Sequence, residues 1–225
     1  MSNEERDRIL KNFREMRLPV MAEQVLMMIE TQEIHSISAI EALERVSEVE
    51  LMSRKNNTVN RLKAAANLSQ RNARFEEIDY RSDRRLNKSV LEQLKSNDYI
   101  LNHRNVILLG ACGTGKSYLA NVLGNHACES RYGTYYCRLF EFLNDCNYSF
   151  QTKGSISEVI NKYLKYSLLI IDDFLISDLS NTETNSLFQL IEYRHNIVSP
   201  SVKHFFRKLS ESRLGFLGLG IEGRA

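Results

Sequence analysis

One stretch of eight residues limits the possible folds of this chain more than any other. It runs from Gly110 to Ser117 and has the spacing G-x-x-x-x-G-K-S. The apolar run Val106–Leu109 precedes it, and residues 118–123, which follow, have helical character. This order of strand, glycine-rich turn and helix start is the context expected of a Walker A phosphate-binding loop. The sequence therefore predicts an open α/β sheet with a nucleotide site at the end of its first strand.

The residue types in this loop suit the binding of a triphosphate. Its three glycines let the backbone adopt conformations that direct several N–H groups at one anion. The helix behind the loop adds unpaired N–H groups and the positive end of its dipole. Lys116 is expected to bind the β- and γ-phosphates, and the Ser117 hydroxyl to bind Mg²⁺. A chance glycine-rich turn is the alternative, which the flanking strand and helix disfavour. The expected nucleotide-binding residues are Gly110, Ala111, Cys112, Gly113, Thr114, Gly115, Lys116 and Ser117.

A second stretch supplies carboxylates for the same site. Residues 166–173 form a near-continuous apolar run that ends in Asp172 and Asp173, as in a Walker B strand. Such a run predicts a central parallel strand, and parallel sheets bind ligands at the carboxyl ends of their strands. We expect Asp172 to hold Mg²⁺ opposite Ser117, and Asp173 and Lys116 to take catalytic roles. Taken alone, this ending is equally common at an ordinary strand end with solvated carboxylates. Its place 56 positions after the loop lysine favours the functional interpretation.

Composition restricts the cellular setting. With 43% hydrophobic and 26% charged residues, the chain can bury a normal globular core. No segment approaches the roughly 18 consecutive apolar residues of a membrane span, and residues 1–7 lack an apolar leader. The four cysteines show no C-x-x-C spacing, which indicates reduced thiols rather than disulfides or zinc ligands. We therefore expect a cytoplasmic protein without membrane contact.

The chain is expected to contain a small all-helical N-terminal domain over residues 1–70, an ATPase core over 71–196 and an atypical tail over 197–225. Apolar residues recur at helical spacing from the start, and no glycine occurs before Gly110. Pro19 separates the first two predicted helices, and Ser36 and Ser38 are candidate caps of the third. A basic helix is predicted over 54–74, and later helices over 88–96, 116–130, 139–150, 156–164 and 183–194.

Charge is unevenly distributed along the chain. Residues 1–53 carry six Lys or Arg against eleven Asp or Glu, whereas residues 54–100 carry eleven against six. A basic segment of this kind can meet a nucleic-acid backbone without reading its sequence. On charge alone, a solvated helix face is an equally good interpretation.

The motifs and their order resemble the IstB-type ATP-binding helper proteins of bacterial insertion-sequence transposition, relatives of the DnaC helicase loaders. The likeness covers about residues 8–195 and is carried by residues 16–22, 61–65, 75–80, 105–110 and 169–174. It implies a P-loop AAA+ core, an open parallel sheet flanked by helices, that uses ATP and Mg²⁺. It also implies ATP-dependent homo-oligomers on DNA, with target DNA delivered to a partner transposase. By the same likeness, the N-terminal helices engage the transposase or DNA.

The C-terminal part departs from that pattern. Such ATPases place a fourth strand with a polar sensor residue after the helix 183–194, and later a lid with an arginine. Residues 197–206 do not have the sequence of that strand, and four of the ten glycines lie in 214–225. A frameshifted or truncated end after about Asn196 is expected, with a genuine variant tail as the alternative. Hydrolysis of ATP is therefore less certain than binding. Arg194 is a candidate for contacting a neighbouring subunit's phosphate, and a helix C-terminal cation is the plainer interpretation.

Three other functions stay open at this point. One is a DnaC-like helicase loader in DNA replication. The others are a nucleotide-binding module that does not hydrolyse ATP and a remnant of a mobile element. A small-molecule P-loop kinase is disfavoured because no arginine-rich substrate lid is present in the sequence.

Overall fold

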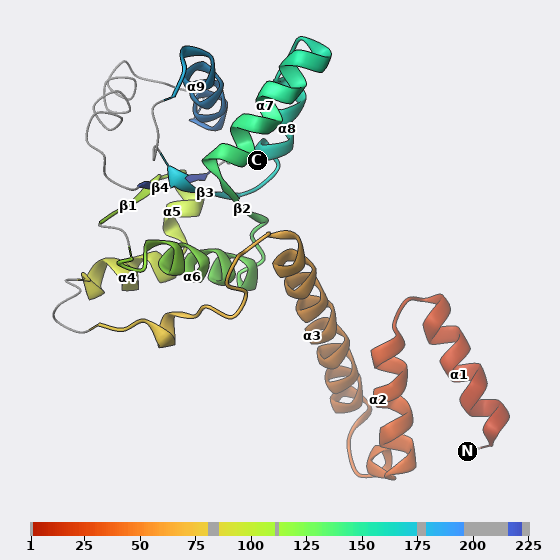
Figure 1. Cartoon of the computed structure of the whole chain (residues 1–225). Coiled ribbons are helices and arrows are strands. Elements are labelled where there is room, and N and C mark those ends of the chain that lie inside the picture. The colour runs from red at the N-terminus through yellow and green to blue at the C-terminus, as the bar shows by residue number, and fades with distance from the viewer. Residues whose placement is uncertain (1, 81–85, 111–112, 175–178, 196–215, 222–225) are drawn as a thin grey trace. The chain divides into compact units, whose positions relative to one another are not determined.

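The computed structural model describes residues 2–80, 86–110, 113–174, 179–195 and 216–221 (Figure 1). The chain divides into two compact units, Met1–Asn60 and Arg61–Ala225. Each is described by itself. Within the described ranges, no helix is both long and apolar enough to cross a membrane.

The first unit is helical. Helix α1 (Asn3–Glu15) begins with a capping box, because the Ser2 hydroxyl accepts the Glu5 N–H and the Glu5 carboxylate accepts the Ser2 N–H. Helix α2 (Pro19–Glu30) has its proline in the first turn, as the sequence predicts, since that position needs no N–H donor. A 3₁₀ turn, η1 (Glu33–His35), leads to the long helix α3 (Ala39–Ala65). The predicted cap Ser38 accepts the Glu41 N–H at 3.1 Å.

Glu50 of α3 replaces the missing side-chain cap of α2. Leu18 stands at the N-cap position and makes no side-chain cap bond. The buried Glu50 carboxylate instead accepts the N–H groups of Val20 and Met21, each at 3.1 Å, and the Arg54 guanidinium at 2.9 Å. Burial alone would raise the pKa of Glu50, but the hydrogen bonds from Arg54, Met21 and Val20 lower it below its ordinary value.

We expect Glu50→Ala to destabilise the start of α2 by about 1–3 kcal/mol, because two buried N–H groups lose their acceptor. The lowered pKa means that this stabilisation is present above the ordinary glutamate pKa and is lost as pH falls through the folded value. Hydrogen exchange of the Val20 and Met21 amides in the full chain, at pH 7 and near pH 4, measures both effects. Glu48→Ala, an exposed change on the same helix, is the control. Equal protection in the two variants would contradict the assignment.

The second unit contains a sheet of four described strands in the order β1-β4-β3-β2. Strand β2 (Thr134–Arg138) pairs in parallel with β3 (Leu168–Phe174). Strand β4 (Phe216–Ile221) pairs antiparallel with both β3 and β1 (Val106–Leu109). Strands β1, β3 and β2 therefore share one direction. This confirms the predicted P-loop α/β class, with one difference: the strand between β1 and β3 runs the opposite way.

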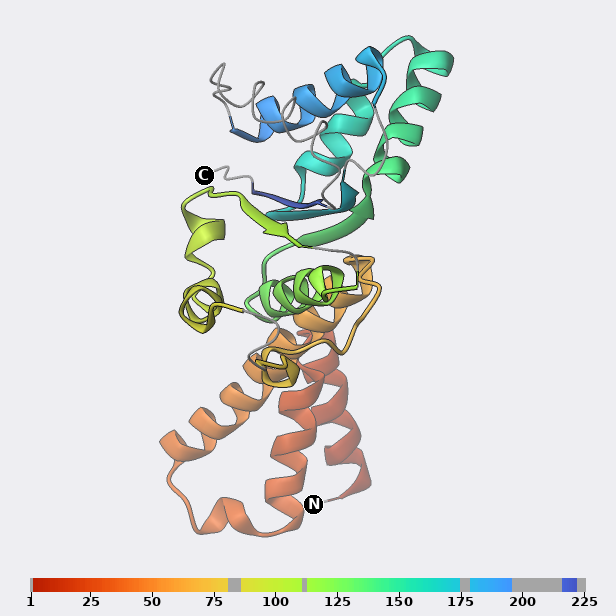
Figure 2. The ribbon, with the colours of Figure 1, turned by 60° about the vertical axis from the view of Figure 1, so that its left-hand side comes forward.

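Helices cover both faces of the sheet (Figures 1 and 2). One layer holds α6 (Lys116–Glu129), α4 (Lys88–Lys95) and the short α5 (Asp98–Leu101). The other holds α7 (Leu139–Lys153), α8 (Ser157–Leu164) and α9 (Asn181–His195). Strand β3 is buried on both sides, as predicted. Leu168 and Ile170 pack in the cluster beneath α6, and Leu169 and Ile171 in the cluster beneath α7.

The prediction of a basic helix over 54–74 is wrong for its C-terminal part. Helix α3 stops at Ala65, and the 3₁₀ turn η2 (Phe75–Glu77) is the next helical element. Asn67 has a left-handed backbone with φ of 54°, and the side chain of Leu68 is buried in the core. The Gln70 N–H binds the side chain of Asn121 on α6 at 3.0 Å instead of a helical carbonyl. Tertiary hydrogen bonds and burial therefore replace helix in this segment.

Candidate functional site

The predicted phosphate loop joins the end of β1 to the start of α6. Gly113 and Gly115 have φ values of 78° and 89°, a backbone region that side-chain-bearing residues rarely adopt. Gly115 stands at the N-cap of α6, which makes no side-chain cap bond. The N-terminus of α6 and the positive end of its dipole therefore lie at the loop, as an anion site requires. Ala111 and Cys112 lie outside the described residues.

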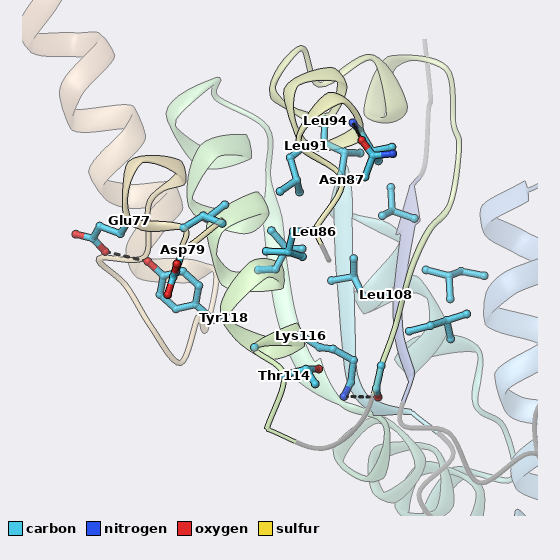
Figure 3. Close-up of a pocket in the computed structure, with 18 residues that line it drawn as sticks. Glu77, Asp79, Leu86, Asn87, Leu91, Leu94, Leu108, Thr114, Lys116 and Tyr118 are labelled. Carbon is cyan, nitrogen blue, oxygen red and sulfur yellow. Dashed lines mark hydrogen bonds between the residues drawn. The ribbon is translucent and has the colours of Figure 1, made fainter. Parts of the chain in front are cut away.

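The side chains of Lys116 and Thr114 lie against Gly110, the first residue of the loop. The Lys116 ammonium donates to the Gly110 carbonyl at 2.9 Å (Figure 3). A Cβ atom on Gly110 would lie only 2.9 Å from the Thr114 hydroxyl, so a side chain at residue 110 would require the Thr114 side chain to shift. Ser117 is half-buried in the first turn of α6. The Lys116 ammonium therefore lies at the loop, and Ser117 follows it in the first turn of α6.

The two aspartates lie at the carboxyl end of β3, on the same edge of the sheet as the loop. In the strand pairing, Phe216 of β4 lies opposite Leu109 on one side and Phe174 on the other. Strands β1 and β3 therefore end at the same level, two strand spacings or about 10 Å apart. This is the crevice at which open α/β sheets bind their ligands.

Asp172 and Asp173 have different surroundings. Asp172 is buried, and its two oxygens accept the Asp173 N–H at 2.8 Å and the Tyr136 hydroxyl. Burial and the neighbouring carboxylate raise the pKa of Tyr136, so the phenol keeps its proton and donates it. Asp173 is exposed, has a left-handed backbone with φ of 53°, and pairs with the Arg138 guanidinium at 3.4 Å. Asp172 can thus hold a cation, while Asp173 can reach a solvent molecule.

The oxygen ligands present fit Mg²⁺. Mg²⁺ is bound through one or two protein oxygens, nucleotide phosphates and water rather than by a cage of protein ligands. Among the described residues, no three His, Cys, Asp or Glu side chains converge on one point. The carboxylate of Asp172 has about four acceptor positions, of which the two hydrogen bonds use two. A hydroxyl from Ser117 and a carboxylate from Asp172 are therefore a suitable pair, and their roles remain predictions.

An apolar cavity of about 810 Å³ opens beside the loop (Figure 3). The size is within the range of about 300–1,000 Å³ that small-molecule sites occupy. Hydrophobic side chains of β1 and α4 form most of the wall, and the Tyr118 hydroxyl donates to Glu77 at 2.9 Å at one side. The sequence motifs do not indicate this cavity. Its lining includes Glu77, Ile78, Asp79, Leu86, Leu91, Leu94, Val106, Leu108, Lys116 and Tyr118.

Arg194 has a structural position. Its side chain is buried, and the guanidinium donates to the carbonyls of Tyr163 at 3.1 Å and Tyr166 at 3.2 Å. These carbonyls lie at the end of α8 and in the turn before β3. The suggestion that Arg194 reaches a neighbouring subunit's phosphate is therefore wrong, because the charge is already bound inside its own chain.

The fold defines a P-loop protein of the AAA+ class. A family profile described as "IstB-like ATP binding protein" matches residues 11–202. The chain therefore belongs to the family of IstB-like ATP-binding proteins, as the resemblance of its motifs implies.

Individual relatives agree with this assignment. A Pseudomonas fluorescens protein described as the ATP-binding protein of insertion sequence IS1162 is 30% identical over 160 residues, 71% of this chain and 69% of the relative. The corresponding IS5376 protein of Geobacillus stearothermophilus is 27% identical over 203 residues, 89% and 80% of the two chains. The chromosomal replication initiator DnaA of Aliarcobacter butzleri is 30% identical over 91 residues, but these are only 20% of its length.

Proposed function

We propose that this protein binds ATP–Mg²⁺ between the Gly110–Ser117 loop and the carboxyl end of β3. The observation that carries the proposal is the convergence of three features on one edge of the sheet. These are the left-handed glycines of the loop, the Lys116 ammonium folded over it and the buried carboxylate of Asp172. The apolar cavity beside the loop would take the nucleoside, and Ser117 and Asp172 would hold the metal on opposite sides of the phosphates.

When bound, Mg²⁺ would neutralise charge that develops on the phosphates during hydrolysis. Lys116 would orient the terminal phosphates, and Asp173 would polarise the attacking water from its exposed position. The ion pair with Arg138 would hold the Asp173 carboxylate near the end of β2. Lys116 and Asp173 are the residues to which we assign catalysis.

We further propose that ATP-bound copies of the chain assemble on DNA and communicate with a transposase. The names of the relatives place ATP-binding proteins of this family in insertion sequences. Residues 54–100 carry eleven basic against six acidic side chains, which suits contact with a phosphate backbone. Within the second unit, Arg61, Arg71 and Arg74 of this segment are exposed.

We expect DNA binding to require ATP–Mg²⁺ and to weaken steeply as salt rises, with little dependence on sequence. Fluorescence anisotropy of a labelled duplex, with and without ATP–Mg²⁺ and at salt concentrations from about 50 to about 200 mM, measures both dependences. Replacing Arg61 and Arg71 together with alanine should reduce the magnitude of the log–log salt slope by about 2 per bound chain. Lys153 is exposed at the end of α7, where it pairs with Glu158, and Lys153→Ala should leave the salt slope unchanged. Identical DNA affinity with and without nucleotide would contradict the proposal.

A second candidate is a nucleotide-dependent binding module without turnover. The described strand next to β3 runs antiparallel to it, and its sequence, Phe-Leu-Gly-Leu-Gly-Ile, contains no polar residue of the kind expected for a sensor. Phosphate release measured beside nucleotide binding separates the two: binding without release favours the module. A helicase loader would instead be identified by capture of a replicative helicase rather than a transposase. The suspected frameshift after about Asn196 concerns residues 197–225, of which the structure describes only 216–221, strand β4.

A further inference from the structure

Tyr136 of β2 lies against the Asp172 carboxylate inside the sheet. Its hydroxyl donates to one carboxylate oxygen of Asp172, and the Asp173 N–H donates to the other at 2.8 Å. Tyr136 and Asp172 are both buried, at 7% exposure each. Two donors on two different oxygens fix the plane of a carboxylate as well as its direction. Tyr136 is thus one of the two groups that set the orientation of Asp172.

The phenol ring alone does not account for a tyrosine at this position. Its ring packs with Leu168 and Ile170 in the core beneath α6, where phenylalanine would fill the same space. A buried hydroxyl without a partner costs about 1–3 kcal/mol, so the hydroxyl is tolerated because of its bond to Asp172. Asp172 in turn is a buried carboxylate, which needs donors of this kind.

A second polar network lies behind the phosphate loop. The Ser69 hydroxyl accepts from the Asn121 amide at 3.0 Å. Asn121 is fully buried on α6, and the same amide nitrogen donates to the Ser117 carbonyl at 2.7 Å. Asn121 therefore connects the segment that contains Ser69 with the backbone of Ser117.

The segment that contains Ser69 is also fixed along β2. The Tyr136 N–H donates to the Ala66 carbonyl at 2.8 Å, and the Asn67 amide donates to the Tyr136 carbonyl at 3.0 Å. Residues 66–70 directly follow helix α3 in the chain. This segment is therefore hydrogen-bonded both to Tyr136 of β2, beside Asp172, and to Asn121 of α6, which binds the Ser117 carbonyl.

We propose that Tyr136 is a positioning residue for magnesium-dependent nucleotide binding, which orients Asp172 toward the metal. The proposal rests on the function proposed above, because it concerns the same metal. Partners of metal-binding residues that do not touch the metal typically change metal affinity by about 10- to 100-fold when they are removed. Loss of the hydroxyl frees the Asp172 carboxylate to turn, so Mg²⁺ affinity decreases while the phosphate loop stays intact.

The test compares Tyr136→Phe with Tyr135→Phe in the full chain. Tyr135 is the preceding residue of β2, and its ring lies on the other face of the sheet, stacked on Tyr166 at 4.8 Å between centroids. Each variant is titrated with Mg²⁺ at fixed fluorescent ATP analogue, and analogue binding is measured separately in EDTA. Tyr136→Phe should raise the half-saturating Mg²⁺ concentration by about 10-fold and change binding in EDTA by less than about 2-fold. Tyr135→Phe should match the unsubstituted protein in both measurements.

The outcomes separate the inference from the function on which it rests. If the unsubstituted protein binds no nucleotide with Mg²⁺, the proposed function fails. If it binds and both tyrosine variants show the same Mg²⁺ dependence, the role of Tyr136 is wrong. A loss of binding that is equal in EDTA and in Mg²⁺ would show a general structural effect and would also overturn it.

Discussion

Replacing Lys116 with alanine should weaken ATP–Mg²⁺ binding by about 10- to 100-fold, because hydrogen bonds between charged groups contribute about 1.5–3 kcal/mol each. The ammonium lies over the loop at 2.9 Å from the Gly110 carbonyl, where a triphosphate would replace that carbonyl as its partner. Isothermal titration with ATP–Mg²⁺ measures the change directly. Phosphate release, if the protein hydrolyses ATP, should fall by at least as much, since the same cation would stabilise the transition state.

The control for Lys116 is a lysine of equal charge far from the loop. Lys153 is exposed at the last turn of α7, about 20 Å along that helix from its start at the edge of the sheet. Lys153→Ala removes the same charge, so any effect of net charge on ATP binding appears in both variants. Circular dichroism establishes that both fold. If Lys116→Ala binds ATP–Mg²⁺ as tightly as Lys153→Ala, the loop is not the phosphate site.

Local sequence was sufficient for the parts of the site that lie on one continuous segment. The glycine spacing predicted a loop between strand and helix, and the structure has β1 ending at Leu109 and α6 beginning at Lys116. The apolar run before Asp172 predicted a strand buried on both faces, which β3 is. In both cases the signal is a local pattern that only one backbone conformation satisfies.

Residues that act through tertiary contacts were not predictable in this way. The contacts of Tyr136 and Arg138 with the aspartates depend on the pairing of β2 with β3, which puts Arg138 opposite Asp172. Ser69 and Asn121 are 52 positions apart, and no local pattern relates them. One signal lies in the spacing of Tyr136 and Arg138, because residues two apart in a strand such as β2 share one face.

The helix predicted over 54–74 and the less favoured role of Arg194 at a neighbouring subunit failed for a shared physical reason, the competition of tertiary partners with local preference. Helix α3 ends at Ala65 because residues 67–70 bind to α6 and β2 instead of continuing the helix. Arg194 ends a helix, as predicted, but its charge satisfies carbonyls before β3 rather than solvent or another subunit. The antiparallel direction of β4 likewise depends on which segment enters the sheet between β1 and β3, and single-segment patterns do not specify that choice.

Helix α7 offers the largest expected effect on stability. Phe142 is fully buried, with its ring edge-to-face against Tyr163 at 5.2 Å, whereas Phe140, two residues earlier, is 68% exposed. Phe142→Ala should reduce the free energy of unfolding by about 3–5 kcal/mol, from lost burial and the cavity left behind. Phe140→Ala makes the same chemical change at the surface and should stay within about 0.5 kcal/mol. Both replacements change helix propensity by the same amount, so the difference in unfolding free energy between them reports the packing between α7, α8 and β3.

Urea unfolding followed by far-ultraviolet circular dichroism measures this difference, because a change in midpoint at constant slope reports stability. Equal midpoints for the two variants would mean that α7 does not pack on the sheet as described. The cluster in which Phe142 packs with Cys137 and Ile171, next to the nucleotide site, would then not form as described.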